Sequence, residues 1–242
     1  MKNFGGNITE KILLNLNKNF KSKIYFYKFI ELKKNKKIFL GKNKNFTIKF
    51  LDKENVFIKF NKKEMKLRNK IIHGNNITVE LFSKKNNKIL YCGVSCALNS
   101  PKKISITPET EIYKVSKPWG HELWINSKSK KYSFKEIFIK KGYKTSLQYH
   151  LKKIETNLLY EGICKLHYST INLKKFNPKY IKKKKMYSCT SIFVKPKTIH
   201  RIEAITDIKL YEVSTAQLSD VVRLQDDSKR PSGKIKTEHK NN

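Results

Sequence analysis

The sequence predicts an all-β protein whose short strands close into barrels or pack as a sandwich. Runs of alternating or β-branched and aromatic residues recur along the chain, for example at residues 23–27, 46–50, 56–60 and 77–82. Such runs are typical of half-buried strands. Clusters rich in Gly, Asn and Lys, at residues 41–43 and 73–76, separate them as turns do. Helical periodicity is weak except over residues 8–20, and closely spaced short strands favour a barrel or sandwich.

A segment punctuated by prolines connects two halves of the chain. Residues 100–118 contain Pro101, Pro108 and Pro118 and show no convincing apolar periodicity. We therefore expect a β-rich N-terminal domain, a second domain and a disordered polar tail. Their expected bounds are residues 1–105, 106–230 and 231–242.

The second half has its own succession of strand-like runs. In chain order they cover residues 132–140, 145–150, 155–160, 164–170, 188–195 and 209–215. Gly142 and Gly162 lie between runs, where turns are expected.

The formal charge of +35 is the most prominent feature of the composition. Of the 54 basic residues, 50 are lysine and 4 are arginine, whereas proteins that read nucleic acids depend on arginine for bidentate and stacking contacts. The lysines spread along the whole chain together with 22 asparagines, which indicates a compositional bias of solvated positions. The sequence therefore argues against a nucleic-acid partner, and a functional anionic partner is the alternative.

The chain is expected to be cytoplasmic and to have no membrane partner. No stretch approaches the roughly 20 apolar residues of a membrane-spanning helix, and the N-terminal region lacks the apolar core of a secretory signal. The four cysteines include no C-x-x-C pair and lie in or beside apolar runs. We expect free thiols in a reducing compartment.

One group of residues in the second half has the chemistry of a metal site. Gln148 and His150 are two positions apart on an expected strand, so their side chains share a face. Glu155 reaches the same place only if residues 151–154 turn or bulge. His200 follows a proline-containing turn some forty residues later. Two imidazoles, a carboxylate and an amide oxygen inside a barrel predict a first-row metal site of N/O type.

This half resembles the cupin superfamily and, within it, the phosphomannose isomerase type II family, which also forms the C-terminal domain of bifunctional isomerase/mannose-1-phosphate guanylyltransferases. The resemblance covers about residues 112–230. It is carried by KPWG at 117–120, FKEI at 134–137, SLQYH at 146–150 with Glu155, PKTIHR at 196–201 and VVRLQDDSKR at 221–230. It implies a double-stranded β-helix, or jelly-roll, barrel. The first half is compatible with a degenerate second cupin, which makes the chain a bicupin; a distinct β-domain is the alternative.

The resemblance also implies roles for single residues. The family's metal-ligand positions are occupied by Gln148, His150, Glu155 and His200. Lys135 falls on a strand lysine near the sugar pocket, and Arg230 on the arginine that ends an activity-linked signature. A salt bridge from Arg230 to Asp226 or Asp227 is the alternative for that arginine. The chain departs from the family pattern at Lys141, Lys153, Lys197, Gln225, Ser228 and Lys229.

The implied activity is that of a metal-dependent sugar-phosphate isomerase that interconverts mannose 6-phosphate and fructose 6-phosphate. This chemistry needs a Lewis acid, a positioned acid or base and a cationic anchor for phosphate. Arg230 or Lys135 is expected to stabilise charge or bind phosphate, and Glu203, His121 and Lys135 are candidates for proton transfer. Zinc is the expected metal, with manganese, iron or nickel as alternatives.

Two other functions remain open on the sequence alone. The altered signature allows a metal-binding cupin that acts on another sugar or sugar nucleotide. The lysine excess allows a non-catalytic sugar- or polyanion-binding protein. The expected partner is a small sugar phosphate, and open strand edges are compatible with a homodimer. The glycine-rich nucleotide loop of the guanylyltransferase half is absent, so that activity is excluded.

Overall fold

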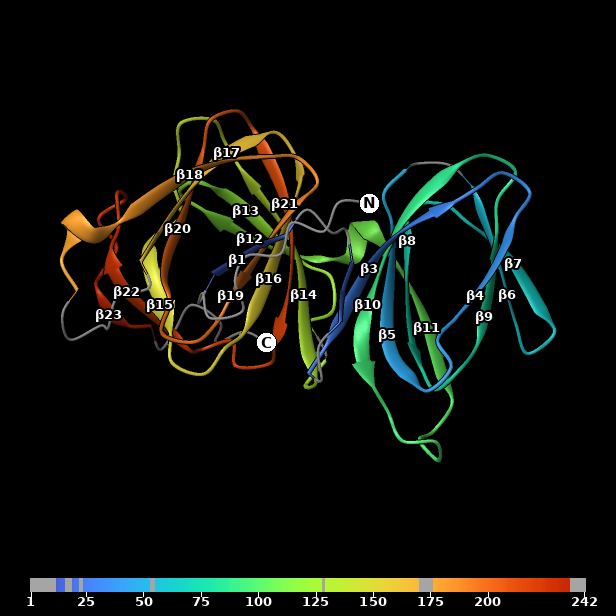
Figure 1. The fold of residues 1–242 in the computed structure, drawn as a ribbon. Helices are drawn as coiled ribbons and strands as arrows, with labels where there is room; N and C mark the ends of the chain where they lie inside the picture. The colour runs from blue at the N-terminus through green and yellow to red at the C-terminus, as the bar shows by residue number, and fades with distance from the viewer. Residues whose placement is uncertain are drawn as a thin grey trace. The chain divides into compact units, whose positions relative to one another are not determined.

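The structure is a computed structural model that describes residues 12–15, 19–21, 24–52, 55–127, 129–169 and 176–235. The chain divides into two compact units (Figure 1). One spans Asn19–Ile112, and the other combines Met1–Lys18 with Tyr113–Asn242. Both are built from antiparallel strands.

The C-terminal unit contains two sheets. The seven-stranded sheet has the order β1 (Ile12–Asn15), β19 (Thr190–Val194), β16 (Glu155–Glu161), β21 (Ile208–Thr215), β14 (Tyr132–Ile139), β13 (Gly120–Trp124) and β12 (Tyr113–Lys117). The six-stranded sheet has the order β18 (Lys182–Tyr187), β17 (Ile163–Ser169), β20 (Ile199–Ala204), β15 (Leu147–His150), β22 (Val221–Gln225) and β23 (Gly233–Lys234).

The core of this unit lies between its two sheets. Ile137, Leu159 and Leu210 come from the seven-stranded sheet and pack with Leu166 and Ile202 of the six-stranded sheet. Because successive side chains of a strand alternate between its faces, each sheet places one apolar row in this core. Several inward positions are instead polar, and these form the site described below.

The N-terminal unit has the same two-sheet plan. One sheet has the order β11 (Lys103–Pro108), β8 (Lys70–Asn75), β5 (Lys44–Phe50), β10 (Asn87–Ser95), β3 (Phe26–Leu32) and β2 (Asn19–Lys21). The other has the order β4 (Lys37–Leu40), β9 (Val79–Phe82), β6 (Val56–Phe60) and β7 (Lys63–Leu67). Its core is apolar and contains Phe46, Ile48, Ile58 and Leu81.

Asparagine serves as the turn residue in much of the N-terminal unit. Asn35, Asn43, Asn61, Asn69 and Asn76 all have positive φ. Asparagine tolerates this left-handed conformation better than other residues with a Cβ atom. The asparagine-rich composition therefore has a structural use where a chain with only nine glycines makes tight turns.

The structure confirms the predicted all-β class and corrects local expectations. The described residues contain 3₁₀ turns at Glu109–Glu111 and Pro178–Tyr180 but no α-helix. The helical periodicity noted over residues 8–20 does not produce a helix at the described residues there, because Ile12–Asn15 form β1 and Asn19–Lys21 form β2. β1 also pairs with β19 and so joins the sheet of the C-terminal unit.

The prediction that residues 231–242 are disordered is wrong at the start of this segment, and the rest of the segment leaves it untested. Gly233 pairs with Arg223, which adds β23 to the edge of the six-stranded sheet. Residues 236–242 lie outside the described residues. Among the described residues, no helix has the length and apolar character needed to cross a bilayer.

Candidate metal centre and its pocket

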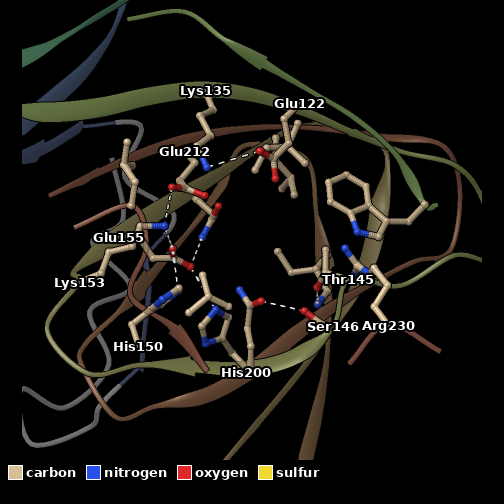
Figure 2. Close-up of a pocket in the computed structure, with 18 residues that line it drawn as sticks. Glu122, Lys135, Thr145, Ser146, His150, Lys153, Glu155, His200, Glu212 and Arg230 are labelled. Carbon is tan, nitrogen blue, oxygen red and sulfur yellow. Dashed lines mark hydrogen bonds and ion pairs between the residues drawn. The ribbon is translucent and has the colours of Figure 1, made fainter. Parts of the chain in front are cut away.

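Three strands bring together two histidines and a glutamate (Figure 2). His150 ends β15, Glu155 begins β16 and His200 lies in β20. A bend after His150 leads the chain into β16. This is the turn at residues 151–154 that the predicted metal site needs for Glu155 to reach the histidines. Nε2 of His200 lies 3.1 Å from Glu155 Oε1, and Nε2 of His150 lies 3.3 Å from Glu155 Oε2. All three side chains are buried, and their ligand atoms lie within 4.8 Å of one another.

Both imidazoles are oriented through their other ring nitrogen. Nδ1 of His150 lies 2.9 Å from the backbone carbonyl oxygen of Asp220, and Nδ1 of His200 lies 3.0 Å from that of Thr198. A carbonyl oxygen only accepts hydrogen bonds, so each Nδ1 carries the proton and donates it. In a neutral imidazole this leaves the Nε2 lone pair directed at the carboxylate. The same arrangement orients histidines that bind metals.

This geometry fits a bound cation. Two Nε2 lone pairs and a carboxylate are all acceptors, and acceptors 3.1 to 3.3 Å apart repel one another unless positive charge lies between them. His150 Nε2 is also a buried polar atom that has no hydrogen-bond partner. The donor set of two imidazoles and one carboxylate suits a divalent first-row metal.

Lys153 supplies fixed positive charge behind the carboxylate. Its Nζ donates to Glu155 Oε2 at 2.6 Å and to Glu212 Oε1 at 2.7 Å, and all three side chains are buried. Burial opposes ionisation of Glu155, but the ammonium group of Lys153 outweighs it and holds the pKa of Glu155 well below the usual range. Burial likewise opposes ionisation of Glu212, and Lys153 followed by Lys135 lowers its pKa. Both carboxylates are therefore charged at neutral pH.

A polar row crosses the inner face of the seven-stranded sheet beside this group. Asn157 of β16 pairs with Glu212 of β21, and Lys135 of β14 pairs with Glu212 on its other side. Asn157 donates to Glu155 Oε1 at 3.1 Å. Lys135 pairs in turn with Trp124 of β13, and its Nζ lies 4.1 Å from the centre of a Trp124 ring.

Glu122 completes the row from the same strand as Trp124. Its Oε2 accepts a hydrogen bond from Trp124 Nε1 at 3.0 Å and lies 3.5 Å from Lys135 Nζ. Burying so many charges inside a barrel is costly unless they are paired. Here the carboxylates and ammonium groups alternate, and Figure 2 shows Glu122, Lys135 and Glu212 on one side of the cavity that also contains the histidines.

Two further predicted residues line the same cavity, which has a volume of about 80 Å³. Gln148 pairs with His200 in register, and its Oε1 accepts a hydrogen bond from Ser146 at 2.8 Å. Gln148 stays a candidate fourth ligand. Arg230 also reaches the cavity, and its Nη2 forms an ion pair with Asp226 Oδ2 at 2.6 Å. Arg230 therefore lines the pocket and also forms the salt bridge to Asp226 that was its alternative role.

Glu203 and His121 do not line this cavity. His200 and Ile202 point inward from β20, so Glu203, three positions beyond His200, faces the other side of the strand. There its Oε2 lies 2.5 Å from Nε2 of His167. The ring of His121 stacks on Phe138 at 5.3 Å between centroids. Of the three expected candidates for proton transfer, Lys135 is therefore the one that lines the cavity of the metal centre.

The sequence reasoning missed Glu122, Lys153 and Glu212 as site residues. Lys153 departs from the family pattern, and its two-residue spacing from Glu155 is the sequence signal that points to it. Glu212 lies in β21 and Glu122 lies in β13, and both side chains are buried. Their roles depend on strand pairing across the sheet, which the local sequence does not contain.

The chain is similar to one protein-family model and to several solved structures. Residues 107–226 match the family model described as mannose-6-phosphate isomerase C-terminal. No curated protein sequence matches the chain. Oxalate decarboxylase from Bacillus subtilis superposes with a TM-score of 0.64 at 10% identity, over 92% of this chain and 78% of that chain. An IolB-like protein from Salmonella typhimurium gives 0.63 at 12% identity, over 83% and 87%. Lactobacillus farciminis oxalate decarboxylase in complex with formate gives 0.64 at 10% identity, over 92% and 88%.

The chain has the cupin fold, and each of its two units is built from two β-sheets. More particularly, residues 107–226 are similar to the mannose-6-phosphate isomerase C-terminal family. The expected family resemblance and the expected fold are both confirmed.

Proposed function

We propose that this protein is a metal-dependent sugar-phosphate isomerase that interconverts mannose 6-phosphate and fructose 6-phosphate. The observation that carries the proposal is the buried group of His150, Glu155 and His200. It lies in a cavity that Lys135 and Arg230 also line. The group and Lys135 fall within residues 107–226, which match an isomerase domain model, and Arg230 lies just beyond that stretch.

The metal would be held by Nε2 of His150, Nε2 of His200 and the Glu155 carboxylate, with Gln148 as the candidate fourth ligand. A divalent ion at this position supplies Lewis-acid chemistry, which stabilises negative charge developing on sugar oxygens. The carbonyls of Asp220 and Thr198 fix the two imidazole rings. Lys153 and Asn157 fix both carboxylate oxygens of Glu155. We expect zinc, and manganese is the first alternative because a structure of B. subtilis oxalate decarboxylase describes Mn(II) centres.

Isomerisation moves one proton between neighbouring carbons. A base takes the proton from C2 of the aldose, giving an enediol, and the same proton returns at C1 while a hydroxyl proton moves from O2 to O1. Glu122 lines the cavity, and neither the metal-binding group nor Lys153 contacts its carboxylate in the interactions described above, so it is suited to be this base. Lys135, 3.5 Å from it, is suited to donate a proton or hydrogen bond to a sugar oxygen.

Arg230 is the candidate phosphate anchor. Asp226 holds its guanidinium through Nε at 2.8 Å and Nη2 at 2.6 Å. An arginine fixed in this way loses less side-chain freedom when it binds a phosphate. The same aspartate also lies 3.4 Å from Arg223 Nε, so its single negative charge is shared by two guanidinium groups.

The test is a metal measurement followed by an isomerase assay. The purified protein is analysed for bound metals by mass spectrometry. Conversion of mannose 6-phosphate is then followed with a coupled glucose-6-phosphate dehydrogenase assay, before chelation, after chelation and after each metal is restored. We expect about one metal ion per chain and activity that chelation removes. A protein that never binds a metal contradicts the proposal.

A metal-binding cupin that acts on another sugar or sugar nucleotide is the second candidate. The observation that favours it is the changed signature around Arg230, where Ser228 and Lys229 precede the arginine. Lys229 adopts a positive φ of 58°, which a glycine adopts more easily. A metal-loaded protein that does not isomerise mannose 6-phosphate supports this candidate over the first.

A further inference from the structure

We propose that the N-terminal unit contains a separate binding site for a phosphorylated small molecule with a flat ring, of the size of a mononucleotide. The site is a cavity of about 440 Å³. It lies against β3, β5 and β10, which are neighbours in one sheet of this unit (Figure 1). The function proposed for the C-terminal unit does not depend on it.

The cavity opens on the inner face of this sheet. Phe26, Ile30 and Leu32 of β3 all contribute to the apolar core, and Lys28 shares their face because it has the same strand parity. Lys28 pairs in register with Tyr91 of β10, which also belongs to the core. Lys28 is exposed on this face, so the cavity is open to solvent here and places an ammonium group beside apolar core residues.

Positive charge gathers around the cavity without acidic residues to balance it. Lys28, Lys42 and Lys44 line it, and the described lining residues include no aspartate or glutamate. Nζ of Lys44 is held by Ser95 Oγ at 2.9 Å and lies 5.7 Å from the centre of the Phe26 ring. Three ammonium groups match the double charge of a phosphoryl group better than the single charge of a carboxylate.

Aromatic rings form much of the remaining lining. Phe26 and Tyr91 are buried, whereas Phe39 is 65% exposed at the rim. The described lining contains hydroxyl groups but no amide or carboxylate side chain of the kind that binds sugar hydroxyls. Rings beside lysines suit a flat ring that stacks, such as a nucleobase, joined to a phosphate.

The buried hydroxyl of Tyr91 adds a directed polar contact. It accepts the backbone N–H of Gly41 at 3.2 Å, so its own proton can be donated. Burial raises the pKa of Tyr91, and the hydroxyl therefore stays protonated. Cavities that bind small molecules commonly have volumes of roughly 300–1,000 Å³, so this one has room for far more than an inorganic phosphate ion.

The test is calorimetric titration of the full chain, treated with chelator, in about 150 mM salt so that diffuse charge attraction is screened. The probes are uridine 5′-monophosphate, uridine, inorganic phosphate and mannose 6-phosphate. We expect one nucleotide per chain, bound at least tenfold more tightly than uridine, inorganic phosphate or mannose 6-phosphate. The absence of nucleotide binding, or equal affinity for nucleotide and inorganic phosphate, overturns the proposal.

Two pairs of lysine variants separate a built site from the general charge of the chain. Lys28→Gln with Lys42→Gln removes two lining charges, and we expect at least a tenfold loss of nucleotide affinity. Lys33→Gln with Lys63→Gln removes two exposed charges of the same unit outside the cavity and should leave the affinity unchanged. Equal losses in both pairs overturn the site.

A variant at the rim of the cavity tests the contact with the ligand's ring without a large effect on protein stability. Phe39→Ala truncates an exposed side chain, so the unfolding midpoint should change little. We expect weaker nucleotide binding and unchanged binding of inorganic phosphate. Nucleotide binding that is unaffected by Phe39→Ala and by the lining lysine variants, and is lost in His150→Ala, places the nucleotide in the C-terminal cavity and overturns the proposal.

Discussion

Lys153 determines the charge of the metal centre from within the barrel. Its ammonium group is fully enclosed between the carboxylates of Glu155 and Glu212, and burial, which lowers its pKa, is outweighed by these two charges, which raise it. The lysine therefore stays protonated, and both of its partners stay ionised. The carboxylate offered to a metal is thus fixed in position and in charge before a metal arrives.

Replacing Lys153 by methionine should destabilise the protein strongly. The change leaves two buried carboxylates without their shared cation, and breaking a buried ion pair in this way costs about 3–5 kcal/mol. Lys153→Arg should recover most of the loss because it keeps the charge. Urea unfolding monitored by circular dichroism measures both. A methionine variant as stable as the parent protein shows that the cation is not needed.

Glu155 and Glu203 provide a matched pair for the metal site. Both are carboxylates of the C-terminal unit that contact a histidine, but only Glu155 lies in the cavity. Glu155→Gln should lower divalent-metal affinity at least tenfold, and Glu203→Gln should leave it unchanged. Competition with a chromophoric chelator measures the affinities. Equal effects of the two changes contradict the assignment of Glu155 as a ligand.

At the scale of elements, glycine positions decide how strands join. Gly120 begins β13 with φ of +152°, and a Cβ atom there lies 2.0 Å from the carbonyl oxygen of Phe138. Gly142 has φ of +81° and open space around the same Cβ position. A side chain at Gly120 would therefore meet both a clash with the neighbouring strand and backbone strain. A side chain at Gly142 would meet backbone strain alone.

Alanine at these two glycines should have unequal effects. Gly142→Ala should cost about 1–2 kcal/mol of unfolding free energy for the left-handed backbone. Gly120→Ala should cost about 1–3 kcal/mol more, because β14 must move away from the new methyl group. Chemical denaturation of both variants gives the comparison. Equal losses mean that the clash with Phe138 is relieved without cost.

The end of β22 is tied to β20 by a pH-dependent ion pair. Arg201 Nη2 lies 2.7 Å from Asp227 Oδ1. Burial opposes ionisation of Asp227, but Arg201, with a smaller effect of Lys144, lowers its pKa below the usual value. The pair therefore stabilises the fold above the unfolded pKa of about 3.9, and this contribution is lost as pH falls through the lower folded pKa.

Asp227→Asn should therefore make the acid limb of stability shallower. The variant should be less stable than the parent at pH 7, and the difference should shrink as pH falls below about 4. Arg201→Met should reduce the pH dependence in the same way, because it removes the partner. Thermal unfolding between pH 3 and pH 7 measures the effect. A constant difference across this range contradicts the role of the pair.

Strand parity explains which site residues the sequence could predict. Gln148 and His150 share a face because they are two apart, and that inference needs only the strand period. Glu203 is three positions from His200 on one strand and faces away, so the same rule argues against it. Glu212 and Glu122 depend on register between strands far apart in the chain. Register is set by the whole sheet, and no local pattern contains it.

At the scale of the molecule, the two units have separate cores and different interiors. The N-terminal core is apolar, whereas the C-terminal interior contains a charged row and the metal-binding group. Among the described residues, the histidine and glutamate group of the C-terminal unit is the one with the composition of a metal site. A bound metal should therefore stabilise one unit directly.

Hydrogen exchange should localise this effect. At a metal concentration 100 times Kd, binding adds about 2.7 kcal/mol to the stability of the state that binds. Amides of β15, β16 and β20 should become more slowly exchanging with metal, and amides of β5 and β10 should not change. The Glu155→Gln variant should show no difference. Equal protection in both units contradicts a site confined to the C-terminal one.

The pairing of β1 with β19 has a consequence for how the protein is made. Ile12–Asn15 leaves the ribosome long before its partner Thr190–Val194. At about 5–20 residues per second, the strand waits about 10–35 seconds for its neighbour. During that time the whole Asn19–Ile112 unit has been synthesised and can fold. The strand must remain unpaired and unaggregated until the last quarter of the chain emerges, which makes it the natural segment for a chaperone to protect in the nascent chain.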